Sequence, residues 1–191
     1  MCPVNAIRVA YTGELGWELH HPIEMQNYLW DRLLLAGSEY GLKLVGARAQ
    51  NWLRQEKSYR AFGTELGRDA TPLEADLSRF VDLDKEFLGK ERMQQTGVRA
   101  QCVTLLIDGP NDADPWGREA LYLENGTKVG RLTSGGYSVV FNKSIGMGYI
   151  RPDLAKEGQK LKVKMLNSLW DAEVTCDSPY DPSNETIRKD G

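Results

Sequence analysis

The 191-residue sequence contains few of the residues that most catalytic and metal sites use. It has two histidines, His20 and His21, and three cysteines. The histidines are adjacent on a predicted strand, so their side chains face opposite ways and cannot form a relay. Cys2, Cys102 and Cys176 lie far apart, and none has a histidine at ligand spacing. This pattern predicts free thiols in a reducing compartment, with neither a disulfide framework nor a metal site.

Several other signals are also absent. No apolar run approaches the roughly 18 residues that a transmembrane helix needs, and the first residues lack the charged and apolar regions of a signal peptide. The net charge of −3 gives no support to nucleic-acid binding. There is no Gly-x-Gly-x-x-Gly fingerprint, so we expect no flavin or nicotinamide site within these residues. We therefore expect a cytoplasmic location and neither a membrane nor a nucleic-acid partner.

What remains is an ordinary globular composition, with 41% hydrophobic and 27% charged residues. The pattern changes near residues 96–99. Before that point helical periodicity alternates with short strands, and after it short strands recur at intervals of roughly ten residues, as in small barrels and sandwiches. The sequence predicts an α+β fold: an α+β portion over residues 1–97 and an all-β, barrel-like portion over residues 98–191. We expect no helix longer than two turns within residues 100–175.

The first portion can be divided into elements. Strands are predicted over residues 5–10 and 17–20, on either side of a turn that contains two glycines. Pro22 suits the first turn of a helix that Gly37 would end, and residues 42–45 read as a brief apolar strand. Residues 47–57 form the next predicted helix. The polar tail, residues 183–191, is predicted to fray.

Arg48 stands out in the helix predicted over residues 47–57. Ala49, Trp52 and Leu53 share one stripe of this helix, and Arg48 lies in its first turn. A cation is disfavoured near the positive end of the helix dipole, so an anion or another polar partner should hold this arginine. The ordinary alternative is a solvated arginine at a helix start.

Four motifs together resemble the glycine-cleavage T-protein family of tetrahydrofolate-dependent enzymes. They are Tyr-Thr-Gly-Glu-x-Gly-x-Glu over residues 11–18, Leu-Arg-Gln-Glu-Lys over 53–57, Arg-Ala-Phe-Gly over 60–63 and Thr-Pro-Leu-Glu-Ala over 71–75. The second and third motifs resemble one branch in particular, the folate-binding C-terminal part of dimethylglycine and sarcosine dehydrogenases. The resemblance covers residues 4–182, but only the second half of a complete folate-binding unit. An essential aspartate of the family lies in the other half, so we expect no catalytic residue here.

The resemblance implies four cofactor-binding residues. Glu18 matches a glutamate that accepts hydrogen bonds from the pterin ring, and a carboxylate can take two parallel N–H donors. Arg48 matches an arginine that lines the same site, although the family commonly has aspartate where this chain has Ala49. Phe62 replaces a frequent tyrosine and keeps a ring for stacking, while Tyr11 could line the same cleft. Glu18 and Arg48 should then lie on one cleft; without the resemblance, Glu18 reads as an exposed glutamate.

Two further positions invite interpretation. Residues 130–138 resemble the family's Gly-x-x-Thr-Ser-Gly-x-x-Ser segment, which we interpret as a turn whose glycines permit positive φ. A phosphate-binding loop is disfavoured because no Gly-Lys-Ser/Thr follows. Asp76 stands where the family usually has glycine, which predicts an altered turn or a functional side chain.

The sequence therefore predicts part of a tetrahydrofolate-dependent aminomethyl or methylene transferase, with FAD only in an upstream domain. Its partners would be folate and the N-terminal half of the same protein. The isolated chain is expected to be inactive and, with Ile7, Val9 and Trp17 exposed, prone to self-association. Two alternatives remain. One is a non-catalytic folate-fold module like the iron–sulfur assembly relatives, whose Lys-Gly-Cys-Tyr-x-Gly-Gln-Glu motif is absent here; the other is a folate-dependent sulfonium demethylase.

Overall fold

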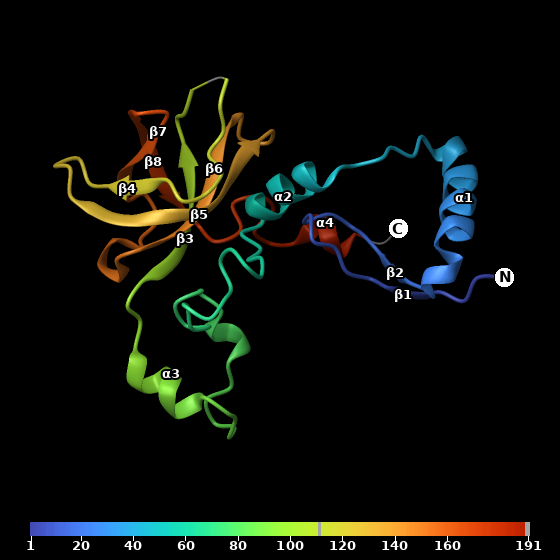
Figure 1. Ribbon diagram of the computed structural model, residues 1–191, viewed down its shortest axis with the longest axis horizontal. Coiled ribbons are helices and arrows are strands. Elements are labelled where there is room, and N and C mark those ends of the chain that lie inside the picture. The colour runs from blue at the N-terminus through green and yellow to red at the C-terminus, as the bar shows by residue number, and fades with distance from the viewer. Residues whose placement is uncertain (111, 190–191) are drawn as a thin grey trace.

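The computed structural model describes residues 1–110 and 112–189, and its N-terminal segment extends away from the rest (Figure 1). Strands β1 (Asn5–Ile7) and β2 (Glu18–His20) form a two-stranded antiparallel sheet in which Ile7 pairs with Glu18. The 3₁₀ turn η1 (Ile23–Met25) leads into helix α1 (Gln26–Gly37), which is followed by η2 (Ser38–Tyr40). The first strand is thus shorter than predicted, because pairing with β2 covers only three residues.

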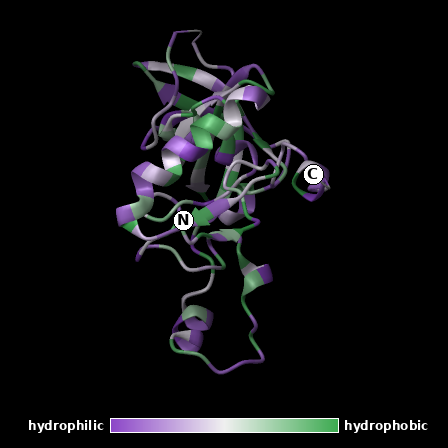
Figure 2. Ribbon diagram, turned by 90° about the vertical axis from the view of Figure 1, so that its right-hand side faces the viewer, coloured by the Kyte–Doolittle hydropathy of each residue, from purple (hydrophilic) through white to green (hydrophobic). Residues whose placement is uncertain are grey.

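Helix α1 packs only weakly within the described chain. It contains no buried residue, and its aromatic side chains Tyr28 and Trp30 are 49% and 48% exposed. Figure 2, which looks onto this side of the molecule, shows hydrophobic and hydrophilic residues together on the N-terminal segment. The strand predicted over residues 42–45 is wrong: these residues form a loop, since no neighbouring strand offers hydrogen bonds to them.

Helix α2 (Ala47–Glu56) joins this segment to the second half of the chain. Below it in Figure 1, a largely irregular stretch contains η3 (Ser78–Phe80) and helix α3 (Lys90–Thr96). Asp76 lies in this stretch with a φ of +59°. This backbone conformation favours glycine. The carboxylate of Asp76 pairs with Arg60 at 3.3 Å.

Six antiparallel strands then close into a barrel. They are β3 (Gln101–Ile107), β4 (Ala120–Tyr122), β5 (Lys128–Ser138), β6 (Lys143–Ile150), β7 (Lys160–Met165) and β8 (Ser168–Thr175), in the order β3-β6-β5-β4-β7-β8. Side chains that alternate along the strands fill the interior, among them Leu105, Leu121, Leu132 and Val163, all with no exposed surface. Within the described part of residues 100–175, the helical segment is the three-residue η4 (Pro152–Leu154). The predicted fold class is confirmed.

The interpretation of residues 130–138 as a turn is wrong. They belong to β5, and its glycines do not have positive φ. They are needed because other groups come too close for a side chain: a Cβ on Gly130 would lie 2.1 Å from the Tyr149 carbonyl oxygen, and one on Gly136 would lie 2.1 Å from Cδ1 of Trp52. The glycines therefore let β6 and α2 approach this strand.

The C-terminal segment returns to the N-terminal loop. Helix α4 (Glu185–Arg188) is capped by Asp181, whose carboxylate accepts hydrogen bonds from the backbone N–H groups of Glu185 and Thr186. The fully buried Lys57 donates to the Asp181 carbonyl at 2.6 Å and to Asn184 Oδ1 at 2.8 Å. Burial lowers the pKa of Lys57, and Asp181 counteracts this effect. The prediction that the tail frays is wrong for residues 183–189; residues 190–191 lie outside the described chain.

No helix formed by residues 1–110 and 112–189 is both long and apolar enough to cross a bilayer.

Candidate functional site

Helix α2 is held against the barrel by buried charges. Its inward face is formed by Arg54, Gln55 and Glu56, which are 1%, 0% and 2% exposed, whereas the predicted apolar stripe is only half-buried. Arg54 donates to Glu65 at 2.8 Å and to the Ser134 hydroxyl at 2.6 Å. Ser138 on β5 donates to Glu56. Helix α2, which carries Arg48 in its first turn, is therefore fixed to β5 by polar contacts.

Glu65 is the centre of this network. One carboxylate oxygen accepts hydrogen bonds from the hydroxyls of Thr133 and Ser134, both at 2.6 Å, and the other accepts from Arg54. Burial alone would raise the pKa of Glu65, but Arg54 and the two hydroxyls outweigh it and hold this pKa below its ordinary value. Glu65 is therefore ionised, and its carboxylate oxygens already accept hydrogen bonds from Arg54, Thr133 and Ser134.

Arg48 is clamped at the start of α2 but remains 63% exposed. Its guanidinium lies 5.1 Å from the ring centroid of Trp52 and 5.5 Å from that of Trp116. Asp114, in the loop before β4, lies 3.7 Å away and is the anionic partner that the helix position predicted. The barrel loop and the helix together orient an arginine whose donors are still accessible.

Glu18 lies on the exposed side of β2. Its carboxylate is 54% exposed and lies 3.4 Å from Nε2 of His20. Within residues 1–110 and 112–189, no hydrogen bond or ion pair joins Glu18 to Arg48. The structure presents both groups to solvent but does not bring them into contact.

Tyr11 and Phe62, the two aromatic residues predicted to bind folate, differ in their exposure to solvent. Tyr11 is half-buried, stacks on Tyr59 with a centroid distance of 6.1 Å, and donates to the Arg60 carbonyl at 3.1 Å. Burial raises the pKa of Tyr11. Phe62 is 89% exposed beside Gly63, so its ring is available for stacking. Within the described residues, the ring of Tyr11 stacks on Tyr59 and not on Phe62.

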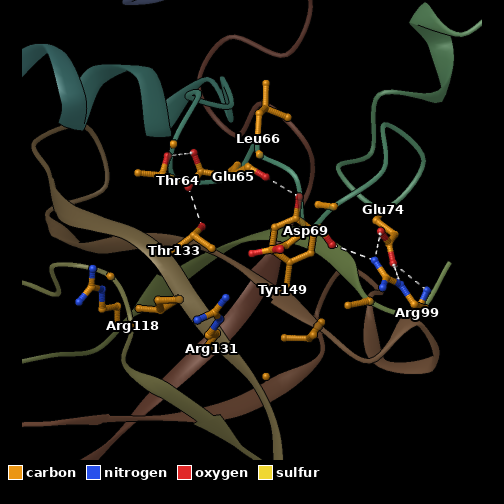
Figure 3. Close-up of a pocket in the computed structure, with 18 of the residues that line it drawn as sticks. Thr64, Glu65, Leu66, Asp69, Glu74, Arg99, Arg118, Arg131, Thr133 and Tyr149 are labelled. Atoms are coloured by element: carbon orange, nitrogen blue, oxygen red, sulfur yellow. Dashed lines mark hydrogen bonds and ion pairs between the residues drawn. The ribbon is translucent and has the colours of Figure 1, made fainter. Parts of the chain in front are cut away.

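A cavity of about 950 Å³ lies between the loop after Phe62 and the barrel, and none of the four predicted residues lines it (Figure 3). Polar and apolar groups contribute about equally to its lining, and the larger polar and aromatic side chains in it are those of Arg99, Trp116, Arg118, Arg131, Thr133 and Tyr149. The side chain of Trp116 lines this cavity, and its ring also lies against the guanidinium of Arg48. The sequence did not predict this cavity, because its lining residues come from five separate segments of the chain.

The fold matches that of a known structure. The aminomethyltransferase T of the glycine cleavage system from Bartonella henselae superposes with a TM-score of 0.82 and 25% identity, over 92% of this chain and 49% of that one. Two family models match in sequence. The GCVT N-terminal domain matches residues 1–85, and the glycine cleavage T-protein C-terminal barrel domain matches residues 101–181. The protein belongs to the glycine cleavage T-protein (aminomethyltransferase) family.

Relatives in this family are longer. The chain is 40% identical to mitochondrial dimethylglycine dehydrogenase of Homo sapiens over 199 residues, which is 99% of this chain but 22% of that protein. It is 37% identical to an aminomethyltransferase of Caldanaerobacter subterraneus over 164 residues, or 84% of this chain and 43% of that protein. The chain thus spans less than half the length of these relatives, and it resembles both the dehydrogenase and the aminomethyltransferase branches.

Proposed function

We propose that the chain is the C-terminal half of a tetrahydrofolate-dependent aminomethyl or methylene transfer unit, of the type found in dimethylglycine and sarcosine dehydrogenases. The observation that carries the proposal is the state of Arg48. It is oriented from three sides, by Asp114, Trp52 and Trp116, yet remains largely exposed. An arginine held in this way is prepared to donate to a ligand rather than to stabilise the fold.

The residues fit a pterin in their donor and acceptor chemistry. The Glu18 carboxylate can accept the N–H groups of an aminopyrimidinone edge, Arg48 can donate to its oxygen, and the exposed ring of Phe62 offers an apolar face. Tyr11 would support the site through its contact with Tyr59. When bound, tetrahydrofolate supplies the nitrogen that accepts a one-carbon unit. In our proposal this chain's residues bind and orient the folate and carry no proton-transfer group.

The proposed unit divides into residues 1–97, the C-terminal part of the folate-binding domain, and residues 98–191, the barrel domain with its tail. Two observations support the division: the two family matches cover residues 1–85 and 101–181, and β3 begins at Gln101. We further propose that the N-terminal half of the same protein covers the exposed apolar side chains of β1 and α1, and that any FAD site lies upstream. In isolation the same surface would favour self-association.

Folate binding tests the proposal directly. In a titration of tetrahydrofolate, Glu18→Gln and Arg48→Gln should each weaken binding by about 1–3 kcal/mol, because each leaves polar pterin groups without a charged partner. Glu39→Gln and Arg32→Gln, at exposed positions away from α2, are the matched controls and should not change the affinity. Equal affinities for the wild type and the two site variants would refute the assignment.

A further inference from the structure

Few hydrogen bonds attach residues 1–45 to the rest of the protein. Within residues 1–110 and 112–189, three side chains take part in all of them: Arg8, Tyr11 and Glu14. Arg8 and Glu14 bond to the C-terminal segment, residues 180–189, which lies beside the loop between β1 and β2 (Figure 1). Because Glu18 stands at the end of this loop, its position depends on how the C-terminal segment is held.

The ammonium of Lys57 joins the C-terminal segment to the end of α2. The Lys57 side chain has no exposed surface. It donates to the Asp181 carbonyl at 2.6 Å and to Asn184 Oδ1 at 2.8 Å, and both acceptors belong to the C-terminal segment. Beside it, the N–H group of Tyr180 donates to the Glu56 carbonyl at 2.9 Å. Lys57 therefore provides side-chain bonds that tie this segment to the helix.

The aliphatic part of Lys57 also contacts the loop between β1 and β2. Gly13, near the middle of this loop, is buried and has a φ of +82°. A Cβ on Gly13 would lie 2.2 Å from Cγ and 2.7 Å from Cδ of Lys57, so no other residue type allows this close approach. One side chain thus contacts the C-terminal segment with its ammonium and the loop that leads to Glu18 with its stem.

Lysine is a costly residue for this position. Burying an ammonium removes it from water, and an apolar side chain of similar length could pack against Gly13 without that cost. Unlike an apolar side chain, the ammonium needs acceptors at defined places, and it finds two of them on one segment. Asp181 in turn caps α4, and Asn184 has a φ of +58°. These bonds therefore fix the path of the C-terminal segment as well as its attachment.

Lys57 lies between the two elements that carry the proposed folate-binding charges. Arg48 belongs to α2 and Glu18 follows the loop, and within the described residues no hydrogen bond or ion pair joins them. We propose that Lys57 is a positioning residue: it holds the loop and the C-terminal segment against α2 and so sets the spacing between Glu18 and Arg48. It acts through these segments without touching the ligand, and this inference rests on the proposed function above. A fixed spacing lowers the cost of ordering the site when folate binds.

Lys57→Met tests the ammonium, because methionine keeps an unbranched apolar side chain against Gly13. In the 191-residue chain, hydrogen exchange of the backbone amides of residues 8–20 should become about tenfold faster, while the amides of β3 and β6 keep their protection. The affinity for tetrahydrofolate should fall about tenfold, since the loop must then be ordered when the ligand binds. Lys164→Met, at an exposed position of β7, is the matched control and should change neither quantity.

Tyr180→Phe tests the connection between the C-terminal segment and the loop. It removes only the hydroxyl that donates to Glu14, so it should speed exchange in residues 8–20 and lower the tetrahydrofolate affinity by about threefold. Because both substitutions act through the same segment, the double variant should bind no more weakly than Lys57→Met alone. A purely structural role for Lys57 predicts that the two losses add and that the protection of β3 and β6 falls together with that of the loop.

The outcomes separate this inference from the proposed function. If the wild type binds no tetrahydrofolate, the proposed function fails and this inference fails with it. If the wild type binds and Lys57→Met binds with equal affinity, the positioning role alone is refuted. Unchanged exchange in residues 8–20 of Lys57→Met would also refute it, because the loop would then be held without the ammonium.

Discussion

At the scale of single residues, the buried pair Arg54–Glu65 carries the attachment of α2 to the barrel. Both side chains are almost completely buried and lie 2.8 Å apart. Arg54→Met should destabilise the chain by about 3–5 kcal/mol, because it leaves the charge of Glu65 buried without its cation. Chemical denaturation measures the loss. Combining Arg54→Met with Glu65→Leu should recover much of it, and a loss below about 1 kcal/mol for the single variant would contradict this account.

Glu74 is the residue whose titration the structure describes most clearly. Arg99 donates to both of its carboxylate oxygens, at 2.8 and 3.0 Å, and holds the pKa of Glu74 at about 2 instead of 4.5. Because the folded-state pKa is depressed, this contribution to stability is complete above pH 4.5 and is lost as the pH falls from 4.5 to about 2. The free energy of unfolding of Glu74→Gln should therefore depend less on pH in this window than that of the wild type. Parallel pH profiles for the two proteins would show that the pair does not contribute.

The charged residues also show where sequence reasoning reached its limit. Arg48 was predicted to need an anion because helix geometry alone disfavours a cation in the first turn, and Asp114 supplies it. Nothing local indicated that Arg54, Gln55 and Glu56 face inward, since these residue types are usually exposed and their partners Ser134, Ser138 and Glu65 lie in other segments. Long-range pairing of this kind is visible only in the folded chain.

At the scale of elements, β5 connects the barrel to the helix that carries Arg48. Gly136 on β5 lies directly beneath Trp52, one of the two rings that hold Arg48. Gly136→Ala would place a Cβ 2.1 Å from Cδ1 of Trp52 and 2.4 Å from its Nε1. We expect a loss of about 1–3 kcal/mol in stability, as for other overpacked positions, together with a displaced Trp52.

Thermal denaturation and tetrahydrofolate titration together check this expectation. Gly67→Ala is the matched control, because no atom lies within 4 Å of the Cβ it would add and its φ is not positive. Unchanged stability and folate affinity in Gly136→Ala would show that Trp52 can shift away from β5 at little cost. It would also show that this contact does not set the position of Arg48.

The barrel strands were predictable for a physical reason that fails in the N-terminal segment. Strands β3 and β6 each contain a run of consecutive buried residues, so both of their faces are covered, and each edge finds a partner in the closed order. Residues 42–45 have equally apolar side chains but no adjacent strand, and they remain a loop in which Leu44 and Val45 are 67% and 66% exposed. A local pattern indicates what a segment could form, and the neighbours decide whether it does.

At the scale of the whole molecule, the two parts of the chain differ in how they are stabilised. The barrel has a continuous apolar interior, whereas the segment before α2 exposes Ile7, Val9 and Trp17 at 44%, 45% and 59%. This segment is tied to the rest mainly through polar contacts, such as Arg8 with the Lys189 carbonyl at 2.8 Å and Glu14 with Tyr180 at 2.7 Å. Glu18 therefore sits on the least supported part of the described chain, and Arg48 at its junction with the barrel.

This difference leads to the prediction that the 191-residue chain will not catalyse methylene transfer by itself. Positioning and proton transfer both contribute to rate, and here Glu18 and Arg48 lie on separate elements without a shared contact in the described residues. The proton-handling aspartate of the proposed unit would come from its other half. The assay supplies tetrahydrofolate and formaldehyde to the purified chain and follows the formation of methylene-tetrahydrofolate. We expect the rate of the spontaneous condensation; a clearly faster rate that Glu18→Gln or Arg48→Gln abolishes would mean that the catalytic group lies within this chain.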